Sequence, residues 1–364
     1  MTGTIDGIFP DKQTNHIKEL VSKKLSDGIR RQYYTNALEE EYIPELDRRR
    51  HYEADVKKGV ERLYETTILL EPHTTCLAHC RHCLRGLYKS FALTDSELES
   101  AIKYISSQKD ASEILITGGD PLINPKQTSK IIDDIIDTSP HIKKIRIGSR
   151  LPVHNPELMC TTKNDDYKRL FRKRKELDIE LATQINDPIE LFGGKSAKAY
   201  KVAQDEGVKV YNQAVLLRGV NDNLNTLVNL YNKMRELNIE PHYLFHAIPM
   251  KGTSHMRTSL KEAFDLQSRL TSCGRISGRA KPRLAALTDV GKVEFYPDTI
   301  LDYRETKYRT TFSRDVIVPE YLLKTGYRED ERLKWNPKFK KSSSTIVGKD
   351  GFYRVWYMDA WKNV

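Results

Sequence analysis

The stretch TTILLEPHTTCLAHCRHCLRGLY, residues 66–88, joins a short apolar run to three closely spaced cysteines. The run at residues 66–71 has the length and the apolar content of a buried strand. Cys76, Cys80 and Cys83 follow it in a C-x3-C-x2-C pattern, so we expect them on a loop at the carboxyl end of that strand. Such strand ends are where α/β proteins usually carry their functional groups.

Five further apolar runs, separated by segments with helical signals, repeat this arrangement. They lie at residues 112–118, 142–148, 178–185, 207–215 and 240–248. Thr94 and Glu97 have the spacing of a capping box and mark the start of one intervening helix. Six strands that alternate with helices predict βα units and a parallel sheet. The pattern does not say whether that sheet is open or curls into part of a barrel.

The two ends of the chain differ from this repeat. Residues 36–65 are highly charged and read as helix, with Pro44 as a break or a helix start. Near the other end, Asp350-Gly351 predicts a hairpin turn, and residues 329–345 have the composition of a mobile segment. We therefore expect a helical N-terminal extension at 1–65, a core at 66–295, and a mixed C-terminal extension packed on the core at 296–364.

Composition narrows the range of functions. The chain has 364 residues and a formal net charge of +10, which suits either nucleic acid or an anionic small substrate. Its basic runs are separated in sequence and lack the interleaved aromatic residues that stack on bases, so solvated helix faces are the favoured reading. No stretch reaches the roughly 20 apolar residues that span a bilayer, and the start lacks signal-peptide features. We expect a cytoplasmic protein that does not contact membranes.

The three clustered cysteines indicate a metal site. Five cysteines in a chain of this length do not form a disulfide framework. A structural zinc site needs four ligands, and although His79 or His82 can supply one, no second cysteine knuckle exists. A 4Fe–4S cluster held by three thiolates leaves one iron open to a further ligand. The pattern favours such a cluster, with a non-catalytic Fe–S or zinc module as a remote alternative.

The cysteine loop resembles that of the radical S-adenosylmethionine (SAM) superfamily. The resemblance implies that the open iron binds SAM and that an electron from the cluster cleaves it into methionine and a 5′-deoxyadenosyl radical. That radical abstracts hydrogen from the substrate, while the protein binds, orients and excludes water. His82 matches the position that contacts the adenine in this superfamily.

Further residues at strand ends match SAM contacts of the superfamily. The segment ITGGDPLI resembles the one that hydrogen-bonds the SAM amino group, through Gly118, Gly119 and Asp120. Ser149 and Arg150, after the third strand, are expected to contact the SAM carboxylate or ribose. The fourth and fifth strands end in glutamines that either add polar contacts or bond to the backbone, namely Gln184 and Gln213.

A closer resemblance is to the lysine 2,3-aminomutase family. It rests on CRHCLRGLY, LITGGDPLI, RIGSRLPV, NQAVLLRGVND and KGTSHMRT, which occur in order between residues 66 and 295. The family implies an incomplete α/β barrel of six βα units and migration of an amino group on a substrate bound to pyridoxal phosphate (PLP). Arg85 falls where the family binds the substrate carboxylate, a role that suits the planar guanidinium.

The chain also departs from that family. Thr67 stands where the family has an arginine for the PLP phosphate. Lys292 can be aligned with the PLP lysine, but the glycine-rich run that precedes that lysine in the family is shortened here. Ile248 and Leu287 occupy positions where lysine-specific members have aspartates, and aliphatic side chains cannot pair with an ammonium group. We therefore expect a substrate other than free lysine and leave the presence of PLP open.

The sequence thus predicts a radical SAM enzyme with an amino-acid-like substrate and an aminomutase-type rearrangement. The alternative is a PLP-independent radical SAM enzyme that catalyses epimerisation, elimination or dehydrogenation, on a nucleotide, tRNA or protein. Either enzyme needs a reducing partner such as flavodoxin or ferredoxin, and the oligomeric state is open. His246 and His255, near the end of the sixth strand, are read either as proton donors or as polar loop residues.

Overall fold

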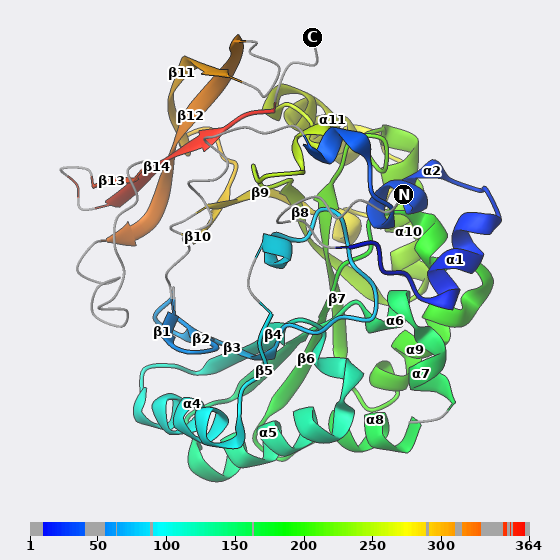
Figure 1. Ribbon diagram of the computed structural model, residues 1–364, viewed down its shortest axis with the longest axis vertical. Helices are drawn as coiled ribbons and strands as arrows, with labels where there is room; N and C mark the ends of the chain where they lie inside the picture. Colours follow the sequence, from blue (N-terminus) through cyan, green and yellow to red (C-terminus); the bar gives the residue numbers. More distant parts are fainter. Residues whose placement is uncertain are drawn as a thin grey trace.

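A ten-stranded sheet forms the centre of the computed structural model, with its strands in sequence order from β1 to β10. Figure 1 shows helices along the outer side of this sheet. The structure describes residues 10–40, 55–62, 64–87, 90–161, 164–288, 291–309, 315–328, 345–347, 350 and 352–360.

Seven consecutive strands of the sheet are parallel: β3 (Thr67–His73), β4 (Glu113–Gly118), β5 (Lys144–Gly148), β6 (Asp178–Thr183), β7 (Lys209–Leu216), β8 (Ile239–His246) and β9 (Arg283–Thr288). The first six coincide with the six apolar runs, which confirms the parallel α/β sheet. The seventh, β9, was missed because its short sequence RLAALT is rich in alanine, which has a weak strand preference. The strand β10 (Gly291–Glu294) then folds back antiparallel on β9.

Helices follow most of the parallel strands: α4 (Asp95–Ser107), α5 (Pro125–Thr138), α6 (Leu151–His154), α7 (Pro156–Cys160), α8 (Asn164–Phe171), α9 (Lys195–Gln204), α10 (Leu224–Glu236) and α11 (Leu260–Ser272). The predicted capping box is confirmed at α4, where Thr94 and Glu97 cap each other's backbone N–H groups. Within β4, Ile114 and Ile116 are fully buried and belong to the same apolar cluster as the helix residue Ile131. The structure contains, in its described ranges, no helix of the length and apolarity that a bilayer crossing requires.

The sheet is strongly curved. The backbone N–H of Lys292, on the last strand, donates a 3.0 Å hydrogen bond to the hydroxyl of Tyr64, which lies just before β3. This bond joins residues from opposite ends of the strand order, so the sheet curls around a concave interior. The curvature is consistent with the incomplete barrel that the family resemblance implies.

The N-terminal segment combines helices with a hairpin that extends the sheet. It contains α1 (Asn15–Ser22), α2 (Asp27–Tyr33), the 3-10 helix η1 (Ala37–Glu40), β1 (Asp55–Lys57) and β2 (Val60–Glu61). The helix predicted for residues 36–65 is wrong at β1 and β2. Gly59 turns the chain there at φ +72°, a conformation that L residues rarely adopt, and Val60 pairs with Leu70 of β3. Pro44 lies outside the described residues.

A second, antiparallel sheet follows β10 and lies at the upper left in Figure 1. Its strands are β11 (Ile300–Arg309), β12 (Asp315–Arg328), β13 (Thr345–Val347) and β14 (Phe352–Met358). β13 pairs antiparallel with β14 on either side of Asp350, which confirms the predicted hairpin. Most of the segment predicted to be mobile, residues 329–344, lies outside the described part of the chain.

His246 connects the two sheets. Its Nε2 donates to the Thr258 carbonyl at 2.7 Å, and its Nδ1 accepts from the Tyr357 hydroxyl at 2.8 Å. Burial lowers the pKa of His246 to about 3, so the ring is neutral. The two hydrogen bonds use both of its nitrogens. His255, in the 3-10 helix η6 (Ser254–Met256), has a pKa lowered to about 4 by burial and by neighbouring arginines.

The contact between the cysteine loop and β4 yields a stability prediction. A Cβ atom at Gly119 would overlap the carbonyl oxygen of Thr75, which is backbone and cannot rotate away. We expect Gly119→Ala to lower the free energy of unfolding by about 1–3 kcal/mol, measured by urea denaturation. Gly278→Ala is the matched control because its Cβ would meet no atom within 4 Å. Equal stability of the two variants would contradict the close approach.

Candidate functional site

The cysteine loop leaves β3 and docks directly on the end of β4. The N–H of Gly119 donates to the His73 carbonyl at 2.7 Å, and that of Asp120 donates to the Thr75 carbonyl at 2.9 Å. A Cβ at Gly118 would lie 2.5 Å from the His73 carbonyl oxygen. The glycine pair, predicted as a SAM contact, is therefore also required for the cysteine loop to take this position.

Asp120 ties the end of β4 to the end of β5. One carboxylate oxygen accepts from the Ser149 hydroxyl at 2.6 Å, and the other accepts from the Arg150 N–H at 3.0 Å. Burial raises the pKa of Asp120 to about 6, although these hydrogen bonds favour the carboxylate. The structure thus brings the predicted contacts Asp120 and Ser149 together, with their side chains bonded to each other.

The three loop cysteines differ in exposure. Cys80 is buried, whereas Cys76 and Cys83 are half-buried. Burial raises the pKa of the Cys76 and Cys80 thiols, and a bound metal would reverse that shift because it stabilises thiolates. In the described ranges, no three His, Cys, Asp or Glu side chains meet as the ligands of a metal ion do. The fit to an iron–sulfur cluster therefore rests on the donor chemistry and on the groups that face Cys80.

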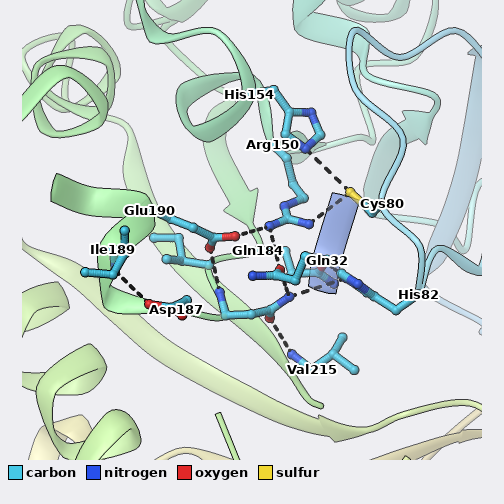
Figure 2. Close-up of polar contacts among 12 residues, drawn as sticks. Gln32, Cys80, His82, Arg150, His154, Gln184, Asp187, Ile189, Glu190 and Val215 are labelled. Carbon is cyan, nitrogen blue, oxygen red and sulfur yellow. Dashed lines mark hydrogen bonds and ion pairs between the residues drawn. The ribbon is translucent and has the colours of Figure 1, made fainter. Parts of the chain in front are cut away.

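Arg150 faces Cys80 from the end of β5 (Figure 2). Its Nη1 donates to the Cys80 Sγ at 2.9 Å, and its Nη2 donates to Glu190 at 2.7 Å and to Gln32 at 3.3 Å. A buried guanidinium beside a cysteine sulfur favours the thiolate that metal ligation needs. The expected contact of Arg150 with SAM stays a prediction, because these bonds turn the guanidinium toward the cysteine loop.

His82 lies in a polar group with two residues that follow β6. Its Nε2 is 2.9 Å from Gln184 Oε1 (Figure 2). The same nitrogen is 3.3 Å from Asn186 Nδ2. Burial lowers the pKa of His82 to about 3, so its ring is neutral and suited to packing on a flat base. The structure brings together the predicted His82 and Gln184 and adds Asn186, which the sequence analysis missed. Gln213, by contrast, lies within β7, opposite Tyr243 of β8.

Glu71 is a second residue that the sequence analysis missed. It lies at the end of β3 and forms an ion pair with Arg85, and both side chains are largely buried. A guanidinium carries five N–H donors in a planar fork, which matches the geometry of a carboxylate. Strand alternation could have identified Glu71 from the sequence. It places Glu71 on the same face of β3 as Thr67, a position that the sequence analysis had already singled out.

Lys292 projects from β10 toward the concave interior. Its Nζ lies 5.0 Å from the ring centroid of Tyr243 and 5.7 Å from that of Phe245. Burial, with a smaller contribution from Arg146, lowers the pKa of Lys292 to about 8. Leu287 is its direct partner on β9, and Ile248 follows the end of β8. Lys292 is thus a buried amine that can lose its proton near neutral pH.

Comparisons with known proteins agree with this arrangement of motifs. No family model matches the chain. A putative L-lysine 2,3-aminomutase of Aquifex aeolicus is 30% identical over 257 residues, 69% of this chain and 67% of that protein. An L-lysine 2,3-aminomutase of Buchnera aphidicola subsp. Baizongia pistaciae is 35% identical over 228 residues, 62% of this chain and 65% of that protein. One from Methanococcus maripaludis is 31% identical over 67% of this chain and 56% of that protein.

The matches therefore span between 56% and 67% of the length of these three relatives. Among solved structures, a radical SAM methyltransferase from Sphaerobacter thermophilus has a TM-score of 0.44 and 16% identity. That comparison covers 64% of this chain and 69% of that chain.

The ion pair of Arg85 with Glu71 predicts strong coupling between the two side chains. We expect Glu71→Gln to lower the free energy of unfolding by about 3–5 kcal/mol, because it leaves a largely buried guanidinium without its counter-ion. The double variant Glu71→Gln/Arg85→Met should be less destabilised than the sum of the two single variants, measured by urea denaturation. Additive effects would contradict a buried pair.

The lowered pKa of Lys292 predicts that this residue reduces the free energy of unfolding in a pH-dependent way. Between pH 8 and about 10.5 the unfolded chain binds more protons at this site than the folded chain, so the cost is full below pH 8 and fades as pH rises. We expect Lys292→Met to be more stable than the wild type at pH 7, by up to about 3 kcal/mol. The advantage should shrink toward pH 10 in urea denaturation, and a difference independent of pH would contradict the buried ammonium.

Proposed function

Because the chain belongs to the lysine 2,3-aminomutase family, we propose that it is a radical SAM enzyme acting on an amino-acid-like substrate. The observation that carries the proposal is the loop with Cys76, Cys80 and Cys83, docked on the glycine pair of β4 and faced by a buried guanidinium. A cluster held by these cysteines would supply the electron that cleaves SAM and starts hydrogen abstraction. An external one-electron donor, such as flavodoxin or ferredoxin, would have to provide that electron.

The residues around the loop have distinct roles in this proposal. The neutral ring of His82, which contacts Gln184, would pack against adenine. Backbone groups of Gly118 and Gly119, at the carboxyl edge of the sheet, are suited to the amino group of SAM. Arg85 would bind the substrate carboxylate, a role for which its planar guanidinium is suited.

The favoured reaction is an aminomutase-type rearrangement. Lys292 supports it, because a buried lysine with a lowered pKa is suited to imine formation with a carbonyl cofactor such as PLP. Free lysine is disfavoured as the substrate, since Leu287 opposite Lys292, and Ile248 after β8, provide no counter-ion for a distal ammonium. The proposed substrate is therefore an amino acid with a different, uncharged or anionic side chain.

A PLP-independent radical reaction is the second candidate. Thr67 lines a pocket at the amino ends of the strands together with Lys144 and Arg146. These two cations are already paired, Lys144 with Glu180 at 2.8 Å and Arg146 with Glu113. Thr67 itself supplies no cation at the position where the family resemblance implies an arginine for the PLP phosphate, which is the feature that favours an enzyme without PLP.

SAM cleavage provides the direct test of the proposed function. Anaerobically reconstituted and reduced protein, given SAM, should release 5′-deoxyadenosine, quantified by chromatography. Cys83→Ala should abolish the product because it removes a cluster ligand. Cys273→Ala is the matched control, since Cys273 caps the distant α11. Wild-type protein that holds a reduced cluster but releases no 5′-deoxyadenosine would refute the proposal.

Lys292 distinguishes the two candidate reactions. If the rearrangement uses PLP, protein incubated with PLP should gain an absorbance band that borohydride removes, and peptide mapping should place the reduced adduct on Lys292. Lys292→Arg, which keeps the charge but cannot form an imine, should lack both signals. A substrate-dependent reaction that Lys292→Arg performs at the wild-type rate would instead favour the PLP-independent enzyme.

A further inference from the structure

Two side-chain nitrogen atoms from one short segment at the end of β5 lie within reach of the Cys80 sulfur. Arg150 Nη1 lies 2.9 Å from its Sγ, and His154 Nε2 lies 3.5 Å from the same sulfur. Residues 150 and 154 are four apart at the start of α6, where the His154 N–H bonds to the Arg150 carbonyl at 2.8 Å. One helical turn therefore directs both side chains to one sulfur, as Figure 2 shows.

The guanidinium of Arg150 is held in this direction from three sides. Glu190 accepts from Nη2 at 2.7 Å, Gln32 accepts at 3.3 Å, and the ring of Tyr33 lies 5.5 Å from the guanidinium carbon. Glu190 is itself fixed, because its other oxygen accepts from the Asn186 N–H at 2.8 Å. Arg150 and Cys80 are each less than a tenth exposed, so water does not compete for the N–H···S contact.

Hydrogen bonds to the sulfur ligands of an iron–sulfur cluster make it easier to reduce. Reduction adds one negative charge to the cluster, and a donor aimed at a ligand sulfur stabilises the more negative state more than the less negative one. A fixed, desolvated cation is an especially strong donor in this setting.

We propose that Arg150, supported by His154, is a positioning residue that raises the reduction potential of the cluster through Cys80. This inference rests on the proposed function, since it requires a cluster on Cys76, Cys80 and Cys83. It assigns Arg150 to the electron-transfer step that precedes SAM cleavage. Gln32 and Glu190 contribute to this effect, because their hydrogen bonds keep the guanidinium directed at the sulfur.

The test is the midpoint potential of the reconstituted cluster, measured by a redox titration followed by electron paramagnetic resonance. In Arg150→Met/Glu190→Gln both buried charges are removed together, which preserves charge balance and favours folding. We expect the reduction equilibrium to become at least tenfold less favourable, which is 59 mV lower for a one-electron couple. Arg150→Lys should recover part of the shift, and His154→Phe should show a smaller decrease in the same direction.

Arg81→Met/Glu39→Gln is the matched control, because it likewise removes both charges of one buried ion pair. Arg81 is a buried cation on the cysteine loop, but its guanidinium forms an ion pair with Glu39. We expect the midpoint potential of the cluster in this control to stay close to the wild-type value. The decrease in Arg150→Met/Glu190→Gln should be much larger. An equal decrease of the midpoint potential in the control and in the Arg150 variant would mean that any buried ion pair near the loop has this effect. That result would overturn the specific role of Arg150.

The outcomes separate the inference from the proposed function. If wild-type protein does not assemble a 4Fe–4S cluster, the proposed function and the inference both fail. If it does, and Arg150→Met/Glu190→Gln and His154→Phe titrate at the wild-type potential, the inference alone is wrong. If the charge-free double variant does not fold, an unchanged potential in both Arg150→Lys and His154→Phe would overturn the inference in the same way.

Discussion

Two backbone hydrogen bonds between the cysteine loop and the end of β4 position the whole candidate site. They run from the N–H groups of Gly119 and Asp120 to the carbonyl groups of His73 and Thr75. They form only because glycine lets these two segments of backbone approach so closely. Parallel neighbouring strands bring their carboxyl ends to one edge, so the loop after β3 has the ends of β4 and β5 beside it. The same constraint brings Arg150 within reach of Cys80.

Buried ion pairs surround the cysteine loop. Each joins an arginine on or beside the loop to a glutamate from another element, as in Arg81 with Glu39, Arg85 with Glu71, and Arg150 with Glu190. Buried pairs contribute little net stability, because desolvation offsets much of their attraction. Breaking one leaves a charge without its partner, so the pairs strongly disfavour other arrangements of the loop. The N-terminal residues Lys12 and Gln32 add backbone contacts to the same loop.

Local patterns in the sequence were sufficient to predict most elements of the core. The strands β3 to β8 have apolar runs of the right length, and the capping box at Thr94 uses only residues of its own helix turn. The prediction was weaker where a strand owes its existence to its neighbour. β9 is stabilised by pairing with β8 and β10, and the charged β1–β2 hairpin is stabilised by pairing with β3.

The amino-acid sequence was enough to predict the donor chemistry of the candidate site, since three thiols at that spacing after a strand suit an iron–sulfur cluster. It was also enough to establish the parallel sheet, because both features depend on residues close together along the chain. The direction of each charged side chain was settled by three-dimensional packing. Arg150 faces Cys80 and Glu190, and Arg85 faces Glu71, because a buried charge must find its partner among residues that folding brings near. For Arg150 those partners lie 70 and 40 positions away, beyond the reach of any local pattern.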